Sequence, residues 1–212
     1  MQLLQALFFL LIIRPLVQII IGLNLHGEEK LPLQGPAIIA ANHNSHLDTL
    51  TLLSLWPLSK VHQVRPAAAA DYFLSNRAMA WFSLNIIGIV PIDRTRQQKE
   101  SDPLADMSAI LDQGQILLLF PEGSRGTPEE RSEFKSGVSR LAELHPEVPI
   151  VPVFMYGLGK SLPRGDFLLV PFFADVLIGD WLYWQGSVEA TQQAYQTAMD
   201  TLAEQLEKPP WE

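Results

Sequence analysis

Apolar residues gather in short runs from residue 35 onward, and segments with helical spacing lie between the runs. Continuous apolarity within a run is typical of strands that are buried on both faces of an α/β sheet. Six runs predict strands, at 37–42, 64–69, 87–93, 115–121, 148–155 and 167–179. Helices are predicted at 45–55, 74–85, 101–113 and 134–144, with an acidic C-terminal helix at 188–207. The pattern therefore predicts one α/β domain with a mixed, largely buried sheet flanked by helices.

The N-terminal segment follows a different pattern. Two apolar runs, residues 3–13 and 16–25, flank Arg14-Pro15. Neither run reaches the roughly 20 apolar residues that a straight membrane crossing needs, and proline interrupts helical hydrogen bonding. We therefore expect an apolar pair of short helices, hinged at Pro15, that lies in a membrane interface. The predicted domain boundary lies at residue 30, with residues 31–212 forming the α/β domain.

Two other arrangements of this segment stay open. A buried amphipathic hairpin would cover the sheet of the same domain, and a single tilted span would place Arg14 near the middle of the bilayer, where a charge is costly. A secretory signal peptide is not expected, because the segment lacks basic residues ahead of its apolar core and a small-residue cleavage site after it.

Composition favours membrane association and excludes several classes of protein. Hydrophobic residues make up 48% of the 212 positions and charged residues 18%, and the mean hydropathy is +0.12. The net charge of -8 argues against a nucleic-acid binder that neutralises phosphates. The absence of cysteine excludes disulfides, thiolate metal sites and cysteine nucleophiles. Because His26, His62 and His145 lack metal-ligand spacing and acidic partners, no metal is expected.

The stretch from Asn42 to Asp48 joins the end of a predicted strand to the start of a predicted helix, where α/β folds place functional side chains. On a regular helix His43 and Asp48 would point about 140° apart, so they meet only across a turn. If Ser45 caps the helix, His43 can fold back so that Asp48 orients its imidazole as a general base. The alternative is a capping box in which Ser45 and Asp48 hold the first turn, and the two interpretations are compatible. His46 is the rival base.

Two further stretches place polar residues at the ends of predicted strands. Residues 122–125, Glu-Gly-Ser-Arg, bring a carboxylate, backbone N–H donors and a guanidinium into one loop. Asp93-Arg94 ends another strand, and the planar guanidinium of Arg94 suits bidentate recognition of phosphate. The alternatives are an ordinary turn and a surface arginine.

Taken in order, four segments resemble the four sequence blocks of the glycerolipid acyltransferases, which include the 1-acylglycerol-3-phosphate acyltransferases. The segments are His43-x4-Asp48, the strand that ends in Asp93-Arg94, Phe120-Pro121-Glu122-Gly123-Ser124-Arg125, and Val151-Pro152-Val153. Phe134-Lys135-Ser136-Gly137 is similar to the family's Phe-Lys-x-Gly stretch. The resemblance covers residues 35–160.

The resemblance implies transfer of a fatty acyl group from acyl-CoA or acyl-carrier protein to the free hydroxyl of a lysophospholipid, without a cofactor. The expected acceptor is 1-acylglycerol-3-phosphate, and the expected product is phosphatidic acid. His43 would act as the general base and Asp48 would orient it. The implied substrate-binding residues are Arg94 for the acceptor phosphate, Lys135 and Arg125 as further cations, and Glu122, Gly123 and Ser124 around the acceptor.

Donor thioesters are made in the cytoplasm, so the expected location is the cytoplasmic side of the cytoplasmic membrane, with peripheral or monotopic attachment to the lipid bilayer. Two alternatives stay open. One is an acyltransferase that acts on another lysolipid or on an amino-acid lipid. The other is a catalytically silent lipid-binding membrane protein, which is disfavoured because such a protein has no chemical reason to keep both His43 and Asp48.

Overall fold

The computed structural model describes residues 1–45, 47–93, 102–123, 134–161 and 173–206. Within these residues, seven strands form one sheet in the order β1-β7-β6-β2-β5-β3-β4. The strands are β1 (Leu23–His26), β2 (Ala37–Ala41), β3 (Val64–Ala69), β4 (Val90–Ile92), β5 (Ile116–Leu119), β6 (Ile150–Tyr156) and β7 (Ala174–Ile178). Strands β6 and β7 pair antiparallel, and the other described pairs run parallel. The predicted α/β class and mixed sheet are confirmed.

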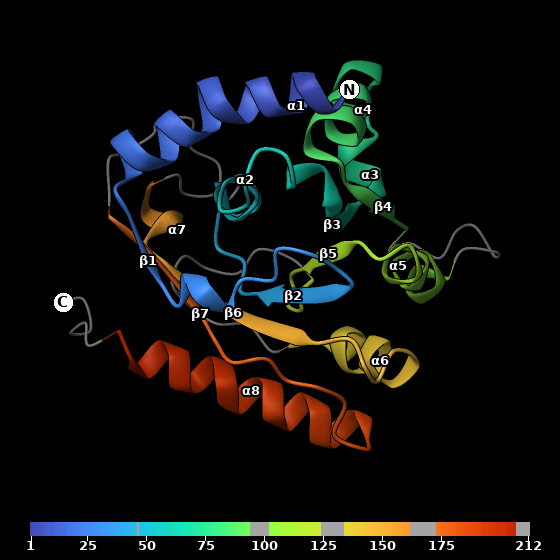
Figure 1. The fold of residues 1–212 in the computed structure, drawn as a ribbon. Helices are drawn as coiled ribbons and strands as arrows, with labels where there is room; N and C mark the ends of the chain where they lie inside the picture. The colour runs from blue at the N-terminus through green and yellow to red at the C-terminus, as the bar shows by residue number, and fades with distance from the viewer. Residues whose placement is uncertain (46, 94–101, 124–133, 162–172, 207–212) are drawn as a thin grey trace.

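Helices cover both faces of the sheet (Figure 1). The N-terminal helix, α2 (Leu47–Ser54), α3 (Ala70–Phe73), α4 (Arg77–Phe82) with its π-helical extension η5 (Ser83–Ile87), and α7 (Leu158–Ser161) lie on one side. The other side carries α5 (Pro103–Asp112), α6 (Gly137–Leu144) and α8 (Val188–Glu204). Short 3-10 helices occupy Glu28–Lys30 and Val61–Gln63.

Alternate side chains of the central strand β2 enter two separate apolar cores. Ile39 packs with the core under the N-terminal helix and α2, whereas Ile38 packs with the core under α5, α6 and α8. Successive side chains of a strand point to opposite faces, so a strand covered on both sides favours apolar residues at successive positions. This is why β2, β5 and β6 appear in the sequence as continuous apolar runs, whereas β3 carries Arg65 and β7 carries Asp175.

The N-terminal segment forms one continuous helix, so the predicted pair hinged at Pro15 is wrong. Residues Gln2–Phe8 are α-helical (α1), and π-helical stretches at Phe9–Ile13 and Leu16–Ile21 lie on either side of Arg14-Pro15. A proline ring clashes with the preceding turn of an ordinary α-helix, and local π turns relieve the clash and re-pair the backbone. The Arg14 guanidinium also finds a partner, since Nη2 donates to the Trp56 carbonyl at 2.9 Å.

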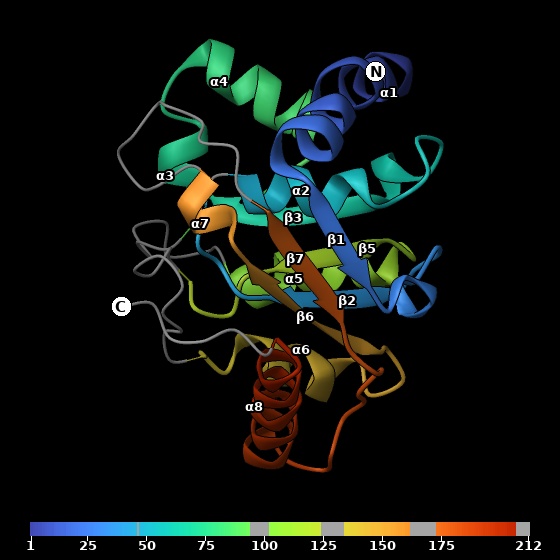
Figure 2. The same cartoon turned by 90° about the vertical axis from the view of Figure 1, so that its left-hand side faces the viewer.

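Strand β1 was not predicted. Its four residues pair parallel with β7, from Leu23 opposite Ala174 to His26 opposite Leu177 (Figure 2). The strand is short and lies at the sheet edge, where alternate residues are exposed, so its sequence lacks the continuous apolarity of the inner strands. It lies on the N-terminal side of residue 30, and a domain boundary at that residue stays a prediction.

Candidate active site

The register of β2 and β5 brings the two main sequence motifs together. The strands are parallel neighbours with Ala40 opposite Leu119. His43 follows β2 and Glu122 follows β5, each three residues beyond that pair. The two motifs therefore meet at the carboxyl edge of the sheet, where α/β folds bind their ligands.

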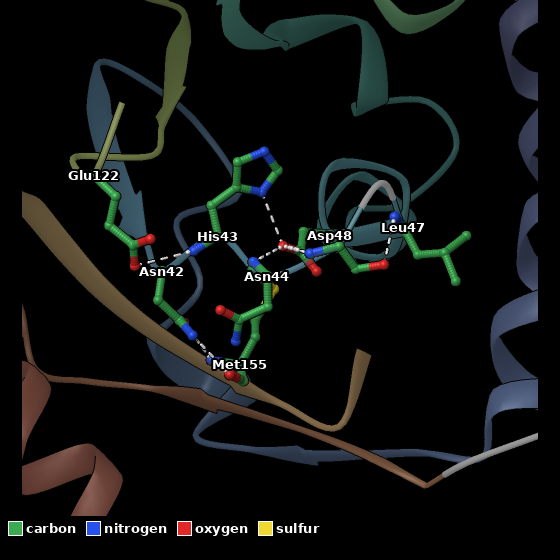
Figure 3. A network of polar contacts seen from close by, with 8 residues as sticks. Asn42, His43, Asn44, Leu47, Asp48, Glu122 and Met155 are labelled. Carbon is green, nitrogen blue, oxygen red and sulfur yellow. Dashed lines mark hydrogen bonds and ion pairs between the residues drawn. The ribbon is translucent and has the colours of Figure 1, made fainter. Parts of the chain in front are cut away.

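Asn42 fixes the point at which the chain leaves β2. Its Nδ2 donates to the Met155 carbonyl at 2.8 Å, and its Oδ1 accepts from the Met155 N–H at 2.7 Å (Figure 3). The buried amide thus replaces the next rung of the β2–β6 pairing and frees its own backbone to turn. The turn places His43 above the edge of the sheet. Sequence reasoning assigned no role to Asn42, although an amide directly after a buried strand was the available signal.

His43 and Asp48 form the hydrogen-bonded pair that the turn makes possible. The His43 Nδ1 lies 2.9 Å from the Asp48 Oδ2, and the Asp48 side chain is fully buried (Figure 3). An ionised carboxylate can only accept, so Nδ1 carries the proton and Nε2 keeps its lone pair. The pair therefore has the arrangement of an oriented general base.

Asp48 also holds the first turn of α2. Its Oδ2 accepts hydrogen bonds from the backbone N–H groups of Asn44, at 2.7 Å, and Ser45, at 2.8 Å. The Ser45 Oγ accepts from the N–H of Leu47 at 3.2 Å. The bonds of a capping box and of an oriented histidine therefore coexist on one carboxylate, as the sequence allowed.

Phe120 packs face to face with the His43 ring. The two ring centroids lie 4.1 Å apart with an interplanar angle of 21°. The contact covers one face of the imidazole and limits rotation of the ring. Phe120 belongs to the third motif, but the sequence analysis assigned it no role.

The Glu122 side chain contacts the backbone of His43. Its Oε1 accepts from the His43 backbone N–H at 3.3 Å, and its Oε2 has no hydrogen-bond partner among the described residues. The pKa of Glu122 is raised from its ordinary value of 4.5 to about 7, chiefly by burial; the hydrogen bond from the His43 N–H lowers the pKa, and the charge of Asp48 contributes to the rise. The carboxyl group therefore exchanges its proton near neutral pH.

The raised pKa of Glu122 should affect how the free energy of unfolding varies with pH. The folded protein holds the Glu122 proton more tightly than the unfolded chain, so folding takes up a proton between pH 4.5 and about 7. The free energy of unfolding should therefore fall as pH rises through this window. Glu122→Gln keeps an acceptor for the His43 N–H but cannot ionise. In urea unfolding at about pH 5 and about pH 8, the variant should lose less stability with rising pH than the wild type; an equal loss would contradict the assignment.

Gly123 and Lys135 lie against each other at the site. Gly123 has a φ of 75°, and a Cβ built on it would lie 2.6 Å from the Lys135 Nζ. The Lys135 N–H donates to the Pro121 carbonyl at 2.9 Å, which ties the two loops together. Glycine therefore serves both the backbone conformation and the close approach of the ammonium group.

A cavity of about 650 Å³ opens beside His43. Gly123, Lys135 and Gly137 contribute to its lining. The wall is largely apolar, and β3, α3, α4 and η5 supply a large share of it. The apolar contributors include Ala67, Ala68, Ala69, Phe73, Phe82, Ile87 and Ile89. A cavity of this size suits a small lipid-like ligand. Its lining offers apolar surface for a hydrocarbon chain and a cation for an anionic group.

The remaining predicted site residues, Arg94, Ser124 and Arg125, lie outside the described residues, as does the rival base His46. Of the predicted residues that the structure describes, His43, Asp48, Glu122, Gly123 and Lys135 gather at one place. The described part of the chain holds no group of three or more acidic, histidine or cysteine side chains that could bind a metal ion.

Several 1-acyl-sn-glycerol-3-phosphate acyltransferases are similar to this chain. The chloroplastic enzyme of Arabidopsis thaliana is 31% identical over 151 residues, which are 68% of this chain and 38% of that protein. The enzyme of Pseudomonas aeruginosa is 26% identical over 198 residues, covering 89% of this chain and 73% of that protein. The chain thus spans about two fifths of the length of its plant relatives.

The fold is also similar to a solved structure. The crystal structure of the 1-acyl-sn-glycerophosphate acyltransferase from Thermotoga maritima matches 98% of this chain and 81% of its own with a TM-score of 0.73, at 20% identity. The sequence model of a family described as "Acyltransferase" matches residues 22–156 of this chain. These residues include both the His43–Asp48 pair and Glu122. Since this match spans well over half of the chain, the protein belongs to the acyltransferase family.

Proposed function

We propose that the protein transfers a fatty acyl group from acyl-CoA or acyl-carrier protein to the free hydroxyl of 1-acylglycerol-3-phosphate and so forms phosphatidic acid. The observation that carries the proposal is the His43–Asp48 pair, with its Nδ1 to Oδ2 distance of 2.9 Å, at a largely apolar cavity that Lys135 also lines. The names of the similar proteins support this acceptor.

The proposed reaction follows from the tautomer of His43. Nε2 takes the proton of the acceptor hydroxyl while the hydroxyl oxygen attacks the thioester carbonyl. The tetrahedral intermediate then expels the thiolate, which accepts from the imidazolium the proton that the hydroxyl gave up and leaves as a thiol. Asp48 stabilises the imidazolium between these steps. The ester bond forms as the thioester bond breaks, so no covalent acyl-enzyme is needed.

Lys135 is the proposed contact for the acceptor phosphate within the described residues, and Arg94 and Arg125 are assigned the same role on the sequence alone. Lys135→Ala should raise the acceptor KM about tenfold, because it removes one charge-assisted hydrogen bond, and should leave the donor KM unchanged. Lys60→Ala is the matched control, since Lys60 lines a different pocket. Equal acceptor KM values in the two variants would remove Lys135 from this role.

The acyl chain is proposed to lie along the alanine-lined wall of the cavity. Ala67, Ala68 and Ala69 of β3 line the cavity, and their small side chains leave it open. Ala68→Leu should therefore lower kcat/KM for long acyl chains more than for short ones. Ala78→Leu, at an exposed position of α4, is the control. A series of acyl-CoA lengths measures the effect; the same chain-length profile in both variants would place the chain elsewhere.

The N-terminal helix is proposed to attach the protein to the membrane. Residues Gln2–Ile19 are long and apolar enough to cross a membrane by length and composition. One stripe of the helix, Phe9, Ile13 and Val17, is buried in the core, while Leu3 and Ile19 are 74% and 80% exposed. A helix that is apolar on both faces and packs on the protein with one of them suits monotopic attachment. The cytoplasmic side is proposed because acyl thioesters are made there.

The cavity wall lies beside this helix. Phe8 of α1 and Phe82 of α4 make an edge-to-face contact at 5.3 Å, and Figure 1 shows the two helices on the same side of the sheet. Trp81 and Leu84 nearby are exposed. Lipid substrates would therefore reach the cavity from the membrane without crossing water.

The acceptor is tested with purified, detergent-solubilised protein and a panel of lysolipids. The panel contains lysophosphatidic acid, lysophosphatidylcholine, lysophosphatidylglycerol and an N-acyl amino acid, each offered with acyl-CoA and with acyl-carrier protein. The proposal predicts the highest kcat/KM for lysophosphatidic acid. Higher values for another acceptor would replace the substrate and keep the chemistry, whereas lipid binding without acylation of any acceptor would support a silent lipid-binding protein.

A further inference from the structure

Helix α8 lies outside the residues that match the family, yet it contacts the residue next to Lys135. The family match ends at residue 156, and α8 spans Val188–Glu204. Figure 1 shows α8 below the sheet beside α6. Its buried face carries Thr191, Tyr195, Met199 and Leu202. The sequence motifs contain none of these positions.

Gln192 of α8 holds the residue before Lys135. Its Nε2 donates to the Phe134 carbonyl at 2.8 Å in a partly buried position. The N–H of the same peptide unit, that of Lys135, donates to the Pro121 carbonyl. The peptide between Phe134 and Lys135 is thus held from two sides, one of which is α8.

Tyr195 supports the same segment one helical turn further along. Its ring meets the buried Phe134 ring at 5.0 Å in an edge-on contact, and its hydroxyl donates to the Ala40 carbonyl at 3.3 Å. Ala40 lies on β2 three residues before His43. Burial and the charge of Glu122 raise the pKa of Tyr195, so its hydroxyl stays neutral beside the site. Helix α8 therefore connects the strand that delivers His43 with the segment that delivers Lys135.

We propose that Gln192 and Tyr195 are positioning residues that hold Phe134-Lys135 so that the Lys135 ammonium lies over Gly123, ready to bind the acceptor phosphate. The inference rests on the proposed function, because it assigns α8 to the acceptor half of that reaction. The two residues act through Lys135 and touch no substrate. Removing the Gln192 amide should let the Lys135 segment move and weaken acceptor binding, while donor binding stays the same.

Gln192→Leu tests this against Gln193→Leu, which changes the neighbouring, exposed glutamine of the same helix. Gln192→Leu should raise the acceptor KM about three- to tenfold, the effect of one neutral hydrogen bond. The donor KM and the melting temperature should match those of the control. In a Lys135→Ala background, Gln192→Leu should have no further effect on the acceptor KM, since both changes act on the same group. Additive effects, or equal increases in both KM values with a lower melting temperature, would overturn the inference.

A second measurement does not depend on the reaction. The rate at which acetic anhydride modifies the Lys135 amine, followed by mass spectrometry with Lys60 as internal reference, reports the surroundings of the ammonium group. Gln192→Leu should change this rate at least twofold relative to Gln193→Leu. An unchanged rate would overturn the positioning role. A changed rate in a protein that acylates no lysolipid would keep the positioning role and refute the proposed function.

Discussion

His43→Ala is expected to lower the turnover number for acyl transfer by about 10²- to 10⁴-fold, the usual contribution of a positioned general base. Without the imidazole, the acceptor hydroxyl must lose its proton to water while it attacks the thioester. The neighbouring groups do not replace it, because the Asp48 carboxylate is fully buried and Glu122 is only 3% exposed. Steady-state kinetics with saturating lysophosphatidic acid and acyl-CoA measure the loss.

The fold should survive this substitution. The His43 side chain is 19% exposed, and Asp48 keeps the backbone N–H groups of Asn44 and Ser45 as partners. The melting temperature and the KM of the acyl donor should therefore stay close to the wild-type values. A variant that folds normally and turns over at the wild-type rate would refute the assignment of His43 as the base.

Asp48→Asn is expected to damage both turnover and stability. The Asp48 Oδ2 accepts from His43, Asn44 and Ser45 at 2.7 to 2.9 Å, and bonds to a charged acceptor are about twice as strong as neutral ones. The amide has no charge to stabilise the imidazolium, and its NH₂ group can turn toward donors. We expect turnover to fall by at least about 10²-fold and the free energy of unfolding to fall by about 1–3 kcal/mol.

The double variant separates the two roles of Asp48. If Asp48 serves catalysis through His43, then Asp48→Asn should cost no further turnover in a His43→Ala background, although its cost in stability should remain. Urea unfolding and steady-state kinetics on the four proteins give both quantities. Asp71→Asn is the matched control, since Asp71 lines the cavity and is exposed. A full additional loss of turnover in the double variant would show that Asp48 acts on the reaction by another route.

The inner strands could be predicted because burial on both faces favours apolar residues at successive positions. Strand β3 occupies the predicted residues 64–69, and β2, β5 and β6 lie within two residues of their predicted bounds. Strand β7 spans the end of the predicted run 167–179, of which residues 167–172 lie outside the described residues. The His43–Asp48 contact was accessible for a related reason. A histidine just before a helix and an aspartate in its first turn can meet only by a turn of the chain, and Ser45 signalled where that turn begins.

Other features depend on tertiary contacts that leave a weak trace in the sequence. Proline at position 15 predicted a break, but π turns on both sides accommodate it and the packing of Phe9 and Ile13 in the core keeps the helix continuous. Strand β1 forms because β7 offers it an edge. The roles of Asn42 and Phe120 depend on the register of β2 with its neighbours, which the pattern of one strand does not contain.

The proposed function requires that His43 catalyse acyl transfer to a lysolipid hydroxyl. The most direct measurement is a single-turnover reaction of purified protein with lysophosphatidic acid and radiolabelled acyl-CoA, run in parallel with His43→Ala and resolved into protein-bound and lipid-bound label. We expect labelled phosphatidic acid from the wild type, almost none from the variant, and no label on the protein at any time. Phosphatidic acid formed equally by both proteins, or a labelled acyl-enzyme that precedes the product, would contradict this expectation.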